Sequence, residues 1–572
     1  MKAMIFLILL LGALSSLFAQ PVEYYFRLPV TRDAKVDILT RLCSVDKVKD
    51  GYVYGYANFT EWQNLLARGY QPERLPNPGS LYQHAMSEDV QKILTDWDTY
   101  PTYLAYVVMM QQFANNFPDI CRLDTMGYSV QGRMLLSLKI SDNPDMDEDE
   151  PEFLYTSTMH GDETVGYVLL LRLIDYLLTN YAQPTPEGQR VTHLVNNMEI
   201  WINPLFNPDG TYYGGNQTVD GAIRFNAHWV DLNRNFPDRI SDPNNTTDGR
   251  EPETAAMMNL VAAHSFNLSA NFHGGAQVVN YPWDNGQPSG TYSACPDDAW
   301  FIDVSMVYAS NNPDILNGGF PNGIINGCQW YAIFGGRQDW IYYWYGGRET
   351  TIELWNVKNP PGSVLPARWH NNKESFLAYM EESLKGIRGI ITDSLTALPL
   401  TAQIDILGID NAPVYTDPDV GDYHRLLQPG NYDVIISADG YQSDTLHSVP
   451  VTDSVATRLD VALLPMNPTG IHEPPVKPAA QDFELQQNFP NPFNPETVIS
   501  YQLSRNGNVQ LMIYNVMGQK VRTLVKREQG AGSYRVKWDG RDDNGQTVAS
   551  GIYLYRIKVG SFFQVREMLL LR

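Results

Sequence analysis

Two stretches of the chain share one pattern, a continuous apolar run that leads into a histidine. The first run covers residues 152–159, and behind it residues 164–178 carry apolar side chains at helical spacing. The second run covers residues 266–272. Short apolar runs predict buried strands, and the helical period predicts a helix that follows the first strand after a tight turn. The pattern is typical of an α/β fold, in which ligands bind where strands end at the sheet edge.

The residues at these two strand ends carry metal-binding chemistry. His160-Gly161-Asp162-Glu163 follows the first run, and His273-Gly274-Gly275 follows the second. Two imidazoles and one carboxylate are a ligand set of catalytic zinc, which leaves the fourth position open for water. A single His-x-x-Glu pair is more often a surface pair on a helix. Two strands that end in such ligands at one edge predict instead a metal site formed by His160, Glu163 and His273.

A third segment, residues 224–238, lies between these two and contains Arg224, Asn233 and Arg234. No glycine-rich loop accompanies the arginines, so the segment suits a carboxylate better than a phosphate. A planar guanidinium group can bind a carboxylate through two hydrogen bonds, which a lysine cannot. Alone, the segment would equally fit a surface cluster of ion pairs. Together with the two histidine motifs, it favours a site that binds a carboxylate beside a metal.

The segments HGDE, DLNRNFPD and SANFHGG together resemble the funnelin-type zinc metallocarboxypeptidases, specifically the regulatory subfamily of carboxypeptidases D, E, M and N. The likeness covers about residues 90–465. It implies a mixed sheet of the eight-stranded type flanked by helices, the carboxypeptidase fold, followed here by two all-β sandwich domains. It also implies one Zn²⁺ per catalytic domain and an exopeptidase whose substrates are the C-termini of peptides or proteins.

The resemblance implies a role for each matching residue of the reaction centre. His160, Glu163 and His273 would be the zinc ligands, and Asp231 would orient His160. Arg224 would polarise the scissile carbonyl, and Glu353 would be the general base. Glu353 lies in an apolar-alternating stretch, residues 349–354, and nothing but the resemblance distinguishes it from the other acidic residues.

The same resemblance implies the residues that hold the substrate. Asn233 and Arg234 would bind its terminal carboxylate, and Tyr331 would swing over the bound C-terminal residue. Asp284, together with Gln338, would select a C-terminal Arg or Lys. Two departures weaken this last role, because Asn285-Gly286 stand where relatives usually have further acids and Trp283 replaces the commoner Phe. The alternative is that Asp284 is a turn residue.

The remaining segments predict a secreted protein of several domains. Residues 1–19 resemble a signal peptide, and residues 20–85 are either a pro-segment or a small stabilising α+β module. The catalytic domain is expected at 86–385, a transthyretin-like β-sandwich at 386–465, and a Pro-rich linker at 466–482. Residues 483–572 resemble the Ig-like C-terminal sorting domain of type-nine secretion substrates. The expectation is export across an outer membrane, with its secretion machinery as a partner, to the medium or the cell surface.

The amino-acid composition argues against some classes of binding partner. The net charge of −23 and the pI of about 4.8 argue against binding to nucleic acid or anionic membranes. Beyond the signal peptide, no stretch reaches the length of apolar sequence that a membrane span needs. The four cysteines are too few for a disulfide scaffold, and a bridge between Cys295 and Cys328 is a guess.

Two other functions stay open at this point. One is a cell-wall peptide amidase of the same fold, which uses the same chemistry on a different end of the substrate chain. The other is a non-catalytic peptide-binding surface protein on a carboxypeptidase scaffold. The subfamily motifs argue against the first, and the presence of every matched functional residue argues against the second.

Overall fold

The computed structural model describes residues 23–30, 35–466, 483–485, 488, 491, 493–503, 507–515, 520–530, 532–543, 545–559 and 562–570. The expected signal peptide and nearly all of the expected linker lie outside these residues. The chain divides into two compact units, one up to Pro468 and one from Thr469. Each is described by itself.

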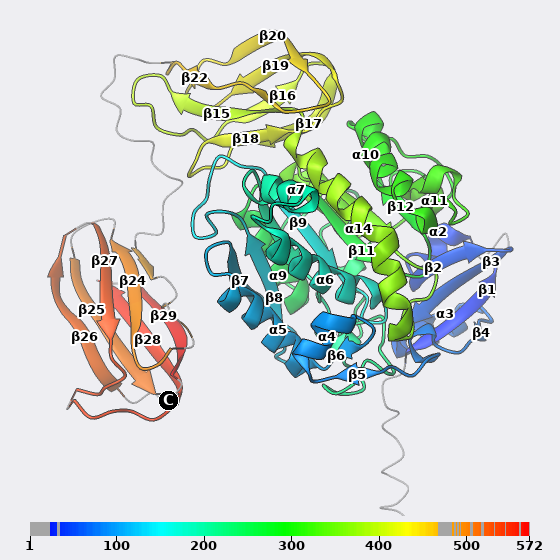
Figure 1. The fold of residues 1–572 in the computed structure, drawn as a ribbon, viewed down its shortest axis with the longest axis horizontal. Coiled ribbons are helices and arrows are strands. Elements are labelled where there is room, and N and C mark those ends of the chain that lie inside the picture. The colour runs from blue at the N-terminus through cyan, green and yellow to red at the C-terminus, as the bar shows by residue number, and fades with distance from the viewer. Residues whose placement is uncertain are drawn as a thin grey trace, which may run out of the picture. The chain divides into compact units, whose positions relative to one another are not determined.

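An eight-stranded mixed sheet forms the centre of the first unit (Figure 1). Its strands are β7 (Cys121–Tyr128), β8 (Met134–Ile140), β9 (Glu152–Ser157), β10 (Glu199–Asn203), β11 (Phe266–His273), β12 (Val278–Tyr281), β13 (Ile324–Asn326) and β14 (Arg348–Glu353). Their order is β13-β12-β14-β11-β9-β10-β8-β7. β10, β9, β11 and β14 are parallel neighbours. β8 runs antiparallel to β10, and β12 runs antiparallel to β14 but parallel to β13. The predicted α/β fold with a mixed eight-stranded sheet is confirmed.

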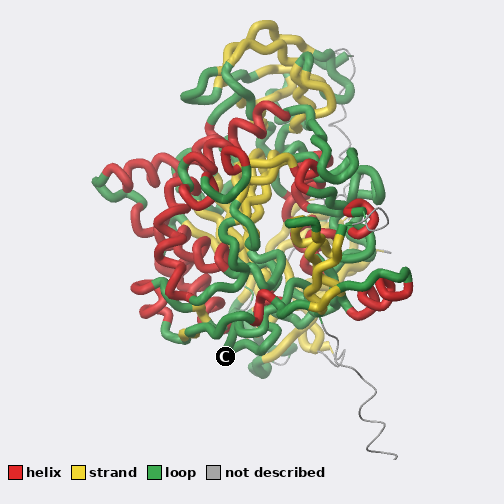
Figure 2. Tube along the Cα trace, turned by 90° about the vertical axis from the view of Figure 1, so that its right-hand side faces the viewer, coloured by secondary structure: helices red, strands yellow, loops and turns green. Residues whose placement is uncertain are grey.

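Helices cover both faces of this sheet, which is why its central strands are apolar without alternation. In β9, Phe153 and Tyr155 belong to the apolar cluster beneath one layer of helices, and Leu154 belongs to the cluster on the other face. The first layer contains α5 (Tyr103–Asn116), α6 (Val165–Asn180), α7 (Pro186–Val195), α10 (Asp298–Ser310) and α14 (Leu365–Glu381), and the second contains α9 (Pro252–Ala263) and α13 (Arg337–Tyr345). Figure 2 shows helices gathered along one flank of the strands. Short helices α4 (Val90–Asp96), α8 (Pro208–Thr211), α11 (Pro313–Leu316) and α12 (Gly327–Trp330) and the strand pair β5 (Met86–Ser87) and β6 (Tyr100–Pro101) complete this part.

Residues 23–75, which we call the N-terminal lobe, form a small α+β unit. A four-stranded antiparallel sheet has the order β2-β3-β1-β4, with β1 (Tyr24–Pro29), β2 (Ser44–Lys49), β3 (Tyr52–Ala57) and β4 (Glu73–Arg74). Helices α2 (Val36–Leu39) and α3 (Phe59–Ala67) accompany it, and Asn58 and Glu61 form a capping box at the start of α3. The apolar core of the lobe extends onto Trp330, Tyr331 and Ile333 of the main body.

Two layers of strands follow the α/β part and enclose their own apolar core. One layer is β18-β15-β21 with β22 beside β15, and the other is β17-β16-β19-β20. The strands are β15 (Ile387–Asp393), β16 (Gln403–Ile406), β17 (Ile409–Tyr415), β18 (Asp422–Arg425), β19 (Gly430–Ser437), β20 (Asp444–Val451), β21 (Thr457–Arg458) and β22 (Val461–Leu463). We call residues 387–463 the middle sandwich. It contacts the α/β part through Arg425, which pairs with buried Asp297.

The second unit is also all-β. Its two sheets are β23-β24-β27 and β26-β25-β28-β29, packed around Leu485, Ile499, Leu511, Trp538 and Tyr555. The strands are β23 (Phe483–Leu485), β24 (Thr497–Leu503), β25 (Gly507–Asn515), β26 (Lys520–Gln529), β27 (Gly532–Trp538), β28 (Gly551–Val559) and β29 (Phe562–Leu570).

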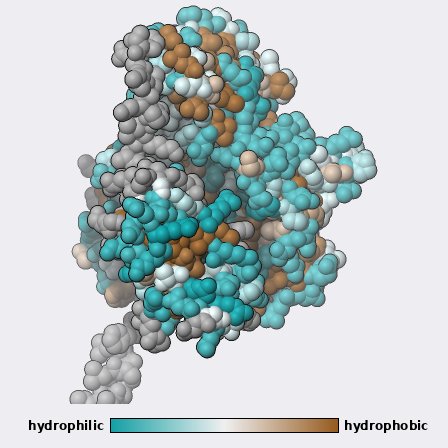
Figure 3. Space-filling view, turned by 90° about the vertical axis from the view of Figure 1, so that its left-hand side faces the viewer, coloured by the Kyte–Doolittle hydropathy of each residue, from teal (hydrophilic) through white to brown (hydrophobic). Residues whose placement is uncertain are grey.

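The state of the cysteines, the apolar character of the helices and one face of the surface complete the description of the fold. Cys43, Cys121, Cys295 and Cys328 are all free thiols, so the guessed Cys295–Cys328 bridge is wrong. Among the described residues, no helix combines the length and the apolar character that crossing a bilayer requires. The face in Figure 3 is mostly hydrophilic, with hydrophobic patches between the polar regions.

Candidate active site

Three parallel strands bring the motif residues to one edge of the sheet. β9, β11 and β14 are neighbours, and the register pairs His273, the last residue of β11, with Glu353, the last residue of β14. The apolar run before His160 predicted a strand up to Met159, but β9 ends at Ser157. Thr158 has a φ of 62°, so the chain turns there before His160 and then enters α6. The turn holds His160 and Glu163 beside the end of β11.

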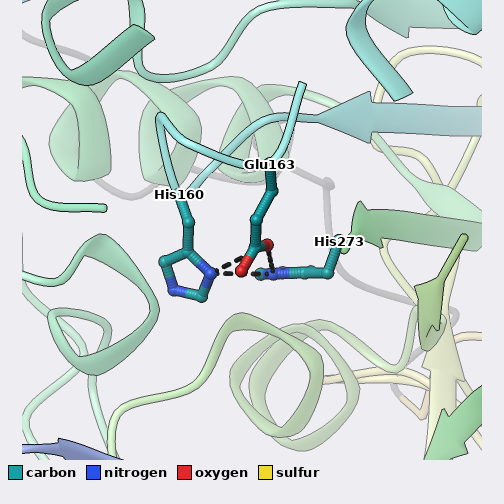
Figure 4. A group of neighbouring side chains, drawn as sticks. All are labelled: His160, Glu163 and His273. Carbon is teal, nitrogen blue, oxygen red and sulfur yellow. Dashed lines mark hydrogen bonds and ion pairs between the residues drawn. The ribbon is translucent and has the colours of Figure 1, made fainter. Parts of the chain in front are cut away.

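His160, Glu163 and His273 converge on one point, as Figure 4 shows. The Nδ1 atoms of His160 and His273 lie 3.0 Å apart. Oε2 of Glu163 lies 3.0 Å from Nδ1 of His160 and 2.8 Å from Nδ1 of His273. Ligand atoms about 2.0–2.1 Å from a tetrahedral zinc lie about 3.3 Å from one another. The three donor atoms therefore have nearly the spacing that one zinc ion needs.

The second nitrogen of His160 is held by a carboxylate. Nε2 of His160 lies 3.0 Å from Oδ1 of Asp231 and donates to it, which leaves Nδ1 free to bind a metal. Asp231 also accepts a hydrogen bond of 3.0 Å from Nε of Arg224 and one of 2.9 Å from the backbone N–H of Asn233. Burial alone would raise the pKa of Asp231, but Arg224 and His160 hold it well below its usual value. Asp231 is thus an ionised acceptor that fixes the ring of His160.

The charges around the three ligands suit a divalent cation. Burial lowers the pKa of His273 to about 4, so its ring is neutral, the form that coordinates metals. Burial would raise the pKa of Glu163, but His160 and Lys358 outweigh it, and the pKa lies well below the usual value. Oε1 of Glu163 accepts from Nζ of Lys358 at 2.7 Å and from Nη1 of Arg224 at 3.3 Å. The donor set, two imidazoles and a carboxylate, fits Zn²⁺.

Glu353 extends into the same cavity from the end of β14. Its Oε2 is shielded from solvent and has no hydrogen-bond partner. Burial, and next the carboxylate of Glu163, raise the pKa of Glu353 to about 8. An unpaired buried carboxylate oxygen with a raised pKa beside a candidate metal centre has the character of a proton acceptor in catalysis.

Groups that can bind a carboxylate line the next part of the cavity. Asn233 belongs to a short 3₁₀ turn, residues 232–234, that follows Asp231, and its Oδ1 accepts from the backbone N–H of Arg337 at 3.0 Å. Nε of Arg234 is buried without a hydrogen-bond partner. Tyr331 is buried, and its hydroxyl donates to the backbone oxygen of Asp46 at 3.2 Å. The structure therefore brings together all three residues of the predicted clamp.

Asp284 lines the same cavity, and Gln338 lies against it. Nε2 of Gln338 donates to Oδ1 of Asp284 at 3.1 Å, and Oε1 of Gln338 accepts from the backbone N–H of Thr351 at 2.8 Å. A β-carbon on Gly327 would lie 1.9 Å from Oδ1 of Asp284, so the carboxyl group needs a glycine there. Burial, and next Asp339, raise the pKa of Asp284 well above its usual value. Asp284 is thus a buried acid in the lining of the cavity, and no ion pair holds its carboxyl group.

Four residues that touch this site were not predicted from the sequence. Lys358 binds the ligand Glu163, Tyr56 donates to Asp162 at 2.8 Å, Ser44 donates to Asp231, and Asp46 lines the cavity from the N-terminal lobe. Lys358 follows the base Glu353 by five residues, and that proximity was the one available signal. Ser44, Asp46 and Tyr56 belong to strands without a recognisable motif. With the lobe in place, the cavity has about 30 Å³ of free space, enough for no more than about two water molecules.

Comparisons with known proteins agree with this geometry. The family "Zinc carboxypeptidase" matches residues 106–375, and "FlgD Ig-like domain" matches residues 494–561. Carboxypeptidase M of Mus musculus is 38% identical over 354 residues, which cover 58% of this chain and 77% of that protein. The catalytic chain of carboxypeptidase N of Mus musculus is 36% identical over 382 residues, or 61% of this chain and 82% of that one.

Other relatives match only in part. Carboxypeptidase D of Homo sapiens is 39% identical over 422 residues, and the chain spans 30% of its length. Among solved structures, the carboxypeptidase A from Helicoverpa armigera matches 63% of this chain and 97% of that one, with 19% identity and a TM-score of 0.46. The convergent His-Glu-His set and the extent of the match to carboxypeptidases M and N lead to one conclusion: the chain belongs to the zinc carboxypeptidase family.

Proposed function

We propose that the chain is a metallocarboxypeptidase that removes the last residue of peptides or proteins, with a preference for C-terminal Arg or Lys. The observation that carries this proposal is the content of one cavity, which His160, Glu163, His273, Arg224, Asn233, Arg234, Asp284, Tyr331 and Glu353 all line. Metal ligands, a base, a carboxylate-binding pair and a buried acid are the parts that hydrolysis of a C-terminal peptide bond requires.

The reaction follows from the position of each group. His160, Glu163 and His273 would hold a zinc ion, which would supply a Lewis acid and would lower the pKa of a water molecule to about 7. The Glu353 carboxylate takes the proton of the attacking water and then gives it to the nitrogen of the leaving amine. The guanidinium of Arg224 stabilises the negative charge on the oxygen of the scissile carbonyl. No covalent intermediate with the protein is needed.

The carboxylate-binding groups confine the reaction to chain ends. Arg234 presents its unpaired Nε–H, and Asn233 its amide, to the terminal carboxylate of the substrate, while Tyr331 closes over the last residue. An internal peptide bond offers no such carboxylate. The enzyme is therefore an exopeptidase rather than an endopeptidase, because this contact places the last peptide bond beside Glu353.

The preference for basic residues is proposed from Asp284. A guanidinium or ammonium group in this part of the cavity supplies the opposite charge that this buried carboxyl group lacks. An aromatic side chain would leave the acid buried without a partner, which costs free energy of binding. Carboxypeptidases D, M and N, the relatives named above, give this preference its comparative support.

We also propose that the protein is exported and that residues 483–572 direct it across an outer membrane. The support is the resemblance of this segment to a sorting domain, together with its separate fold and core. Deletion of residues 483–572 should retain the enzyme in the periplasm of the producing cell. Secretion that is unchanged by this deletion would refute the sorting role.

The proposed activity is tested by kcat/KM on peptides that differ only in a C-terminal Arg, Lys or Phe. We expect Arg and Lys to be preferred over Phe by about 10²-fold, and Asp284→Asn to remove this ratio. Glu353→Gln should lower kcat/KM by about 10²–10⁴-fold while the bound zinc stays at one per chain. Activity that survives Glu353→Gln would show that the base is misassigned. A Phe preference would refute the role of Asp284, and cleavage of cell-wall peptides alone would favour an amidase.

A further inference from the structure

A second cavity lies where the α/β part meets the middle sandwich, and we call it the seam cavity. It has about 500 Å³ of free space, which is enough for a small organic molecule. Its lining comes on one side from the segments that precede β9 and β10 and from the turn between α14 and β15, and on the other side from β15, β18 and β21 of the sandwich. The metal ligands follow the opposite ends of the parallel strands, so the seam cavity is separate from the candidate active site.

Cations outnumber anions in the lining of the seam cavity, although the chain as a whole carries a net charge of −23. Lys385, Arg388 and Arg458 contribute positive charges, and Glu381 contributes a negative one. Nε and Nη2 of Arg190 already bind Glu381 at 2.6 and 2.9 Å. The seam cavity therefore favours an anion over a cation.

Three residues of the lining form a row across adjacent strands. The burial of β15 alternates, with Ile387 and Ile391 in the core of the sandwich and Arg388 on the outer face. In the register of the sheet, Arg388 is paired with His424 of β18 on one side and with Arg458 of β21 on the other. Paired residues of neighbouring strands point to the same face, and like charges at such positions destabilise a sheet. The two neighbouring arginines therefore need negative charge close by.

The outer members of this row have acidic partners, whereas the central one has none. Nε2 of His424 lies 2.9 Å from Oδ2 of Asp422, and Nη1 of Arg458 donates to Asp149. Among the residues that the structure describes, none forms a hydrogen bond or an ion pair with the guanidinium of Arg388. Arg388 thus keeps its N–H donors for a ligand.

Glu150, the acid whose pKa responds to the charge of Arg388, does not neutralise it. Burial, and next the carboxylate of Asp142, raise the pKa of Glu150 to about 8, although Arg388 acts in the opposite direction. Glu150 is therefore mostly protonated at pH 7. The positive charge of Arg388 stays uncompensated within the described part of the chain.

We propose that the seam cavity binds a small organic phosphate, with the phosphate group at Arg388 and the carbon body on the apolar part of the lining. A planar guanidinium binds two phosphate oxygens at once. Leu384, Val455 and Ala456 supply the apolar part, and Val455 is 65% exposed. Because such a ligand would touch both the α/β part and the sandwich, it would strengthen their contact. The inference does not depend on the proposed peptidase function.

The charges around Arg388 suit a phosphate better than a carboxylate. Nζ of Lys385 donates to Glu382 at 2.9 Å and to exposed Asp453 at 2.8 Å, which leaves its third N–H for the ligand. Nε of Arg458 lies 2.7 Å from exposed Asp460. Exposed acids screen these two cations only in part, so their positive charge adds to that of Arg388. A phosphate monoester carries about 1.5–2 negative charges at pH 7 and matches this potential more closely than a single carboxylate.

Calorimetry on the full chain tests the proposal with phenyl phosphate, which joins a phosphate group to an apolar ring. We expect Arg388→Gln to weaken its binding by about 10–100-fold, since hydrogen bonds between charged groups are lost. Val455→Asp places a carboxylate in the lining at an exposed position, should weaken binding as well, and serves if Arg388→Gln fails to fold. Without ligand, Arg388→Gln should melt at the same temperature as the unmodified chain or higher, because it removes the repulsion from Arg458.

Arg556→Gln is the matched control, because Arg556 is also an arginine on the outer face of a strand, but in the second unit. It should bind phenyl phosphate as the unmodified chain does. Equal affinities of the unmodified chain and Arg388→Gln would overturn the inference. A lower melting temperature of ligand-free Arg388→Gln would overturn it too, because Arg388 would then serve the fold.

Two further probes separate the parts of the proposed ligand. Phenylacetate carries a carboxylate in place of the phosphate, and inorganic phosphate lacks the ring. Each should bind at least about 10-fold more weakly than phenyl phosphate. Phenylacetate that binds as tightly would refute the choice of phosphate, and inorganic phosphate that binds as tightly would refute an organic ligand.

Discussion

The N-terminal lobe and the middle sandwich are both small β-rich units packed on the same α/β body, yet they contact it in different ways. The lobe touches Arg224, Arg234, Tyr331 and Lys358, all of which line or border the candidate active site. The sandwich touches Asp297, which lies at the start of α10 and outside the cavity. Contacts to residues of the candidate active site can compete with a substrate. Contacts to a residue outside the cavity, such as Asp297, can only support the fold.

The contact of the sandwich is built around one buried ion cluster. Asp297 receives Arg348 at 2.7 Å, Arg425 at 2.6 Å and the hydroxyl of Tyr342 at 3.0 Å, and all three side chains are buried. Nε of Arg348 and Nε of Arg425 nevertheless stay buried without a hydrogen-bond partner, as does Nε of Arg234 at the lobe. Loss of Asp297 would leave two arginines buried without their counter-charge, which makes this contact costly to break from one side.

The largest effect is expected from Asp297→Asn, which leaves Arg348 and Arg425 buried beside a neutral amide. Removal of one partner from a buried ion cluster costs about 3–5 kcal/mol. Urea unfolding of the full chain should show this loss in the first unit. Asp303→Asn is the control, because Asp303 lies on the same helix and contacts only the exposed side chain of Gln428 from the sandwich. Its effect should stay within about 0.5 kcal/mol. Equal effects of the two variants would contradict a structural role for the Asp297 cluster.

A smaller and local effect is expected from Tyr56→Phe. The variant removes the hydroxyl that donates to buried Asp162, at a cost of about 1–3 kcal/mol to the attachment of the lobe. Amide hydrogen exchange should become faster in β1, β2 and β3 and stay unchanged in β9 and β11, since the lobe opens without unfolding of the main sheet. Tyr82→Phe, at an exposed position, should change neither region. Faster exchange throughout the first unit would mean that lobe and sheet open together.

The smallest effect is a dependence of stability on pH, caused by a carboxyl group that lies near the sandwich. Burial, and next Asp417 of the sandwich, raise the pKa of Asp147 from 3.8 to about 6. Ionisation of this group is therefore less favourable in the folded than in the unfolded chain, and stability is lost as the pH rises from about 4 to about 6. Asp147 is half exposed, so solvent screening keeps the effect below about 1 kcal/mol.

Asp147→Asn should consequently melt about 1 °C higher than the unmodified chain at pH 7 and at the same temperature at pH 4. Differential scanning calorimetry at the two pH values measures this difference. Asp439→Asn, at an exposed position of the sandwich, should show no dependence on pH. A gain at pH 4 equal to that at pH 7 would show that a cause other than charge is responsible.

The α/β character of the fold and the convergence of His160, Glu163 and His273 could be predicted because both depend on local pattern, whereas the mixed eight-stranded sheet was implied by the family resemblance. The apolar runs before His160 and His273 located two strands, and each ligand lies within a few residues of its strand end. Glu353 depended on the family resemblance, since one acid in an alternating strand has no distinguishing feature. Asp46 and Ser44 could not be predicted, because their partners Lys358 and Asp231 lie far away in the chain and nothing in the spacing links them. The end of β9 at Ser157 escaped prediction because Thr158 has no sequence signal for a positive φ.

The pairing of His273 with Glu353 has a consequence for the evolution of such a site. Side chains of a strand alternate between its faces, so deletion of one residue within β14 would turn Glu353 to the opposite side of the sheet. Insertions in the loops beyond either strand leave that pairing untouched. Changes of loop length at the rim of the cleft are therefore compatible with the site, whereas a change in the length of β14 is not.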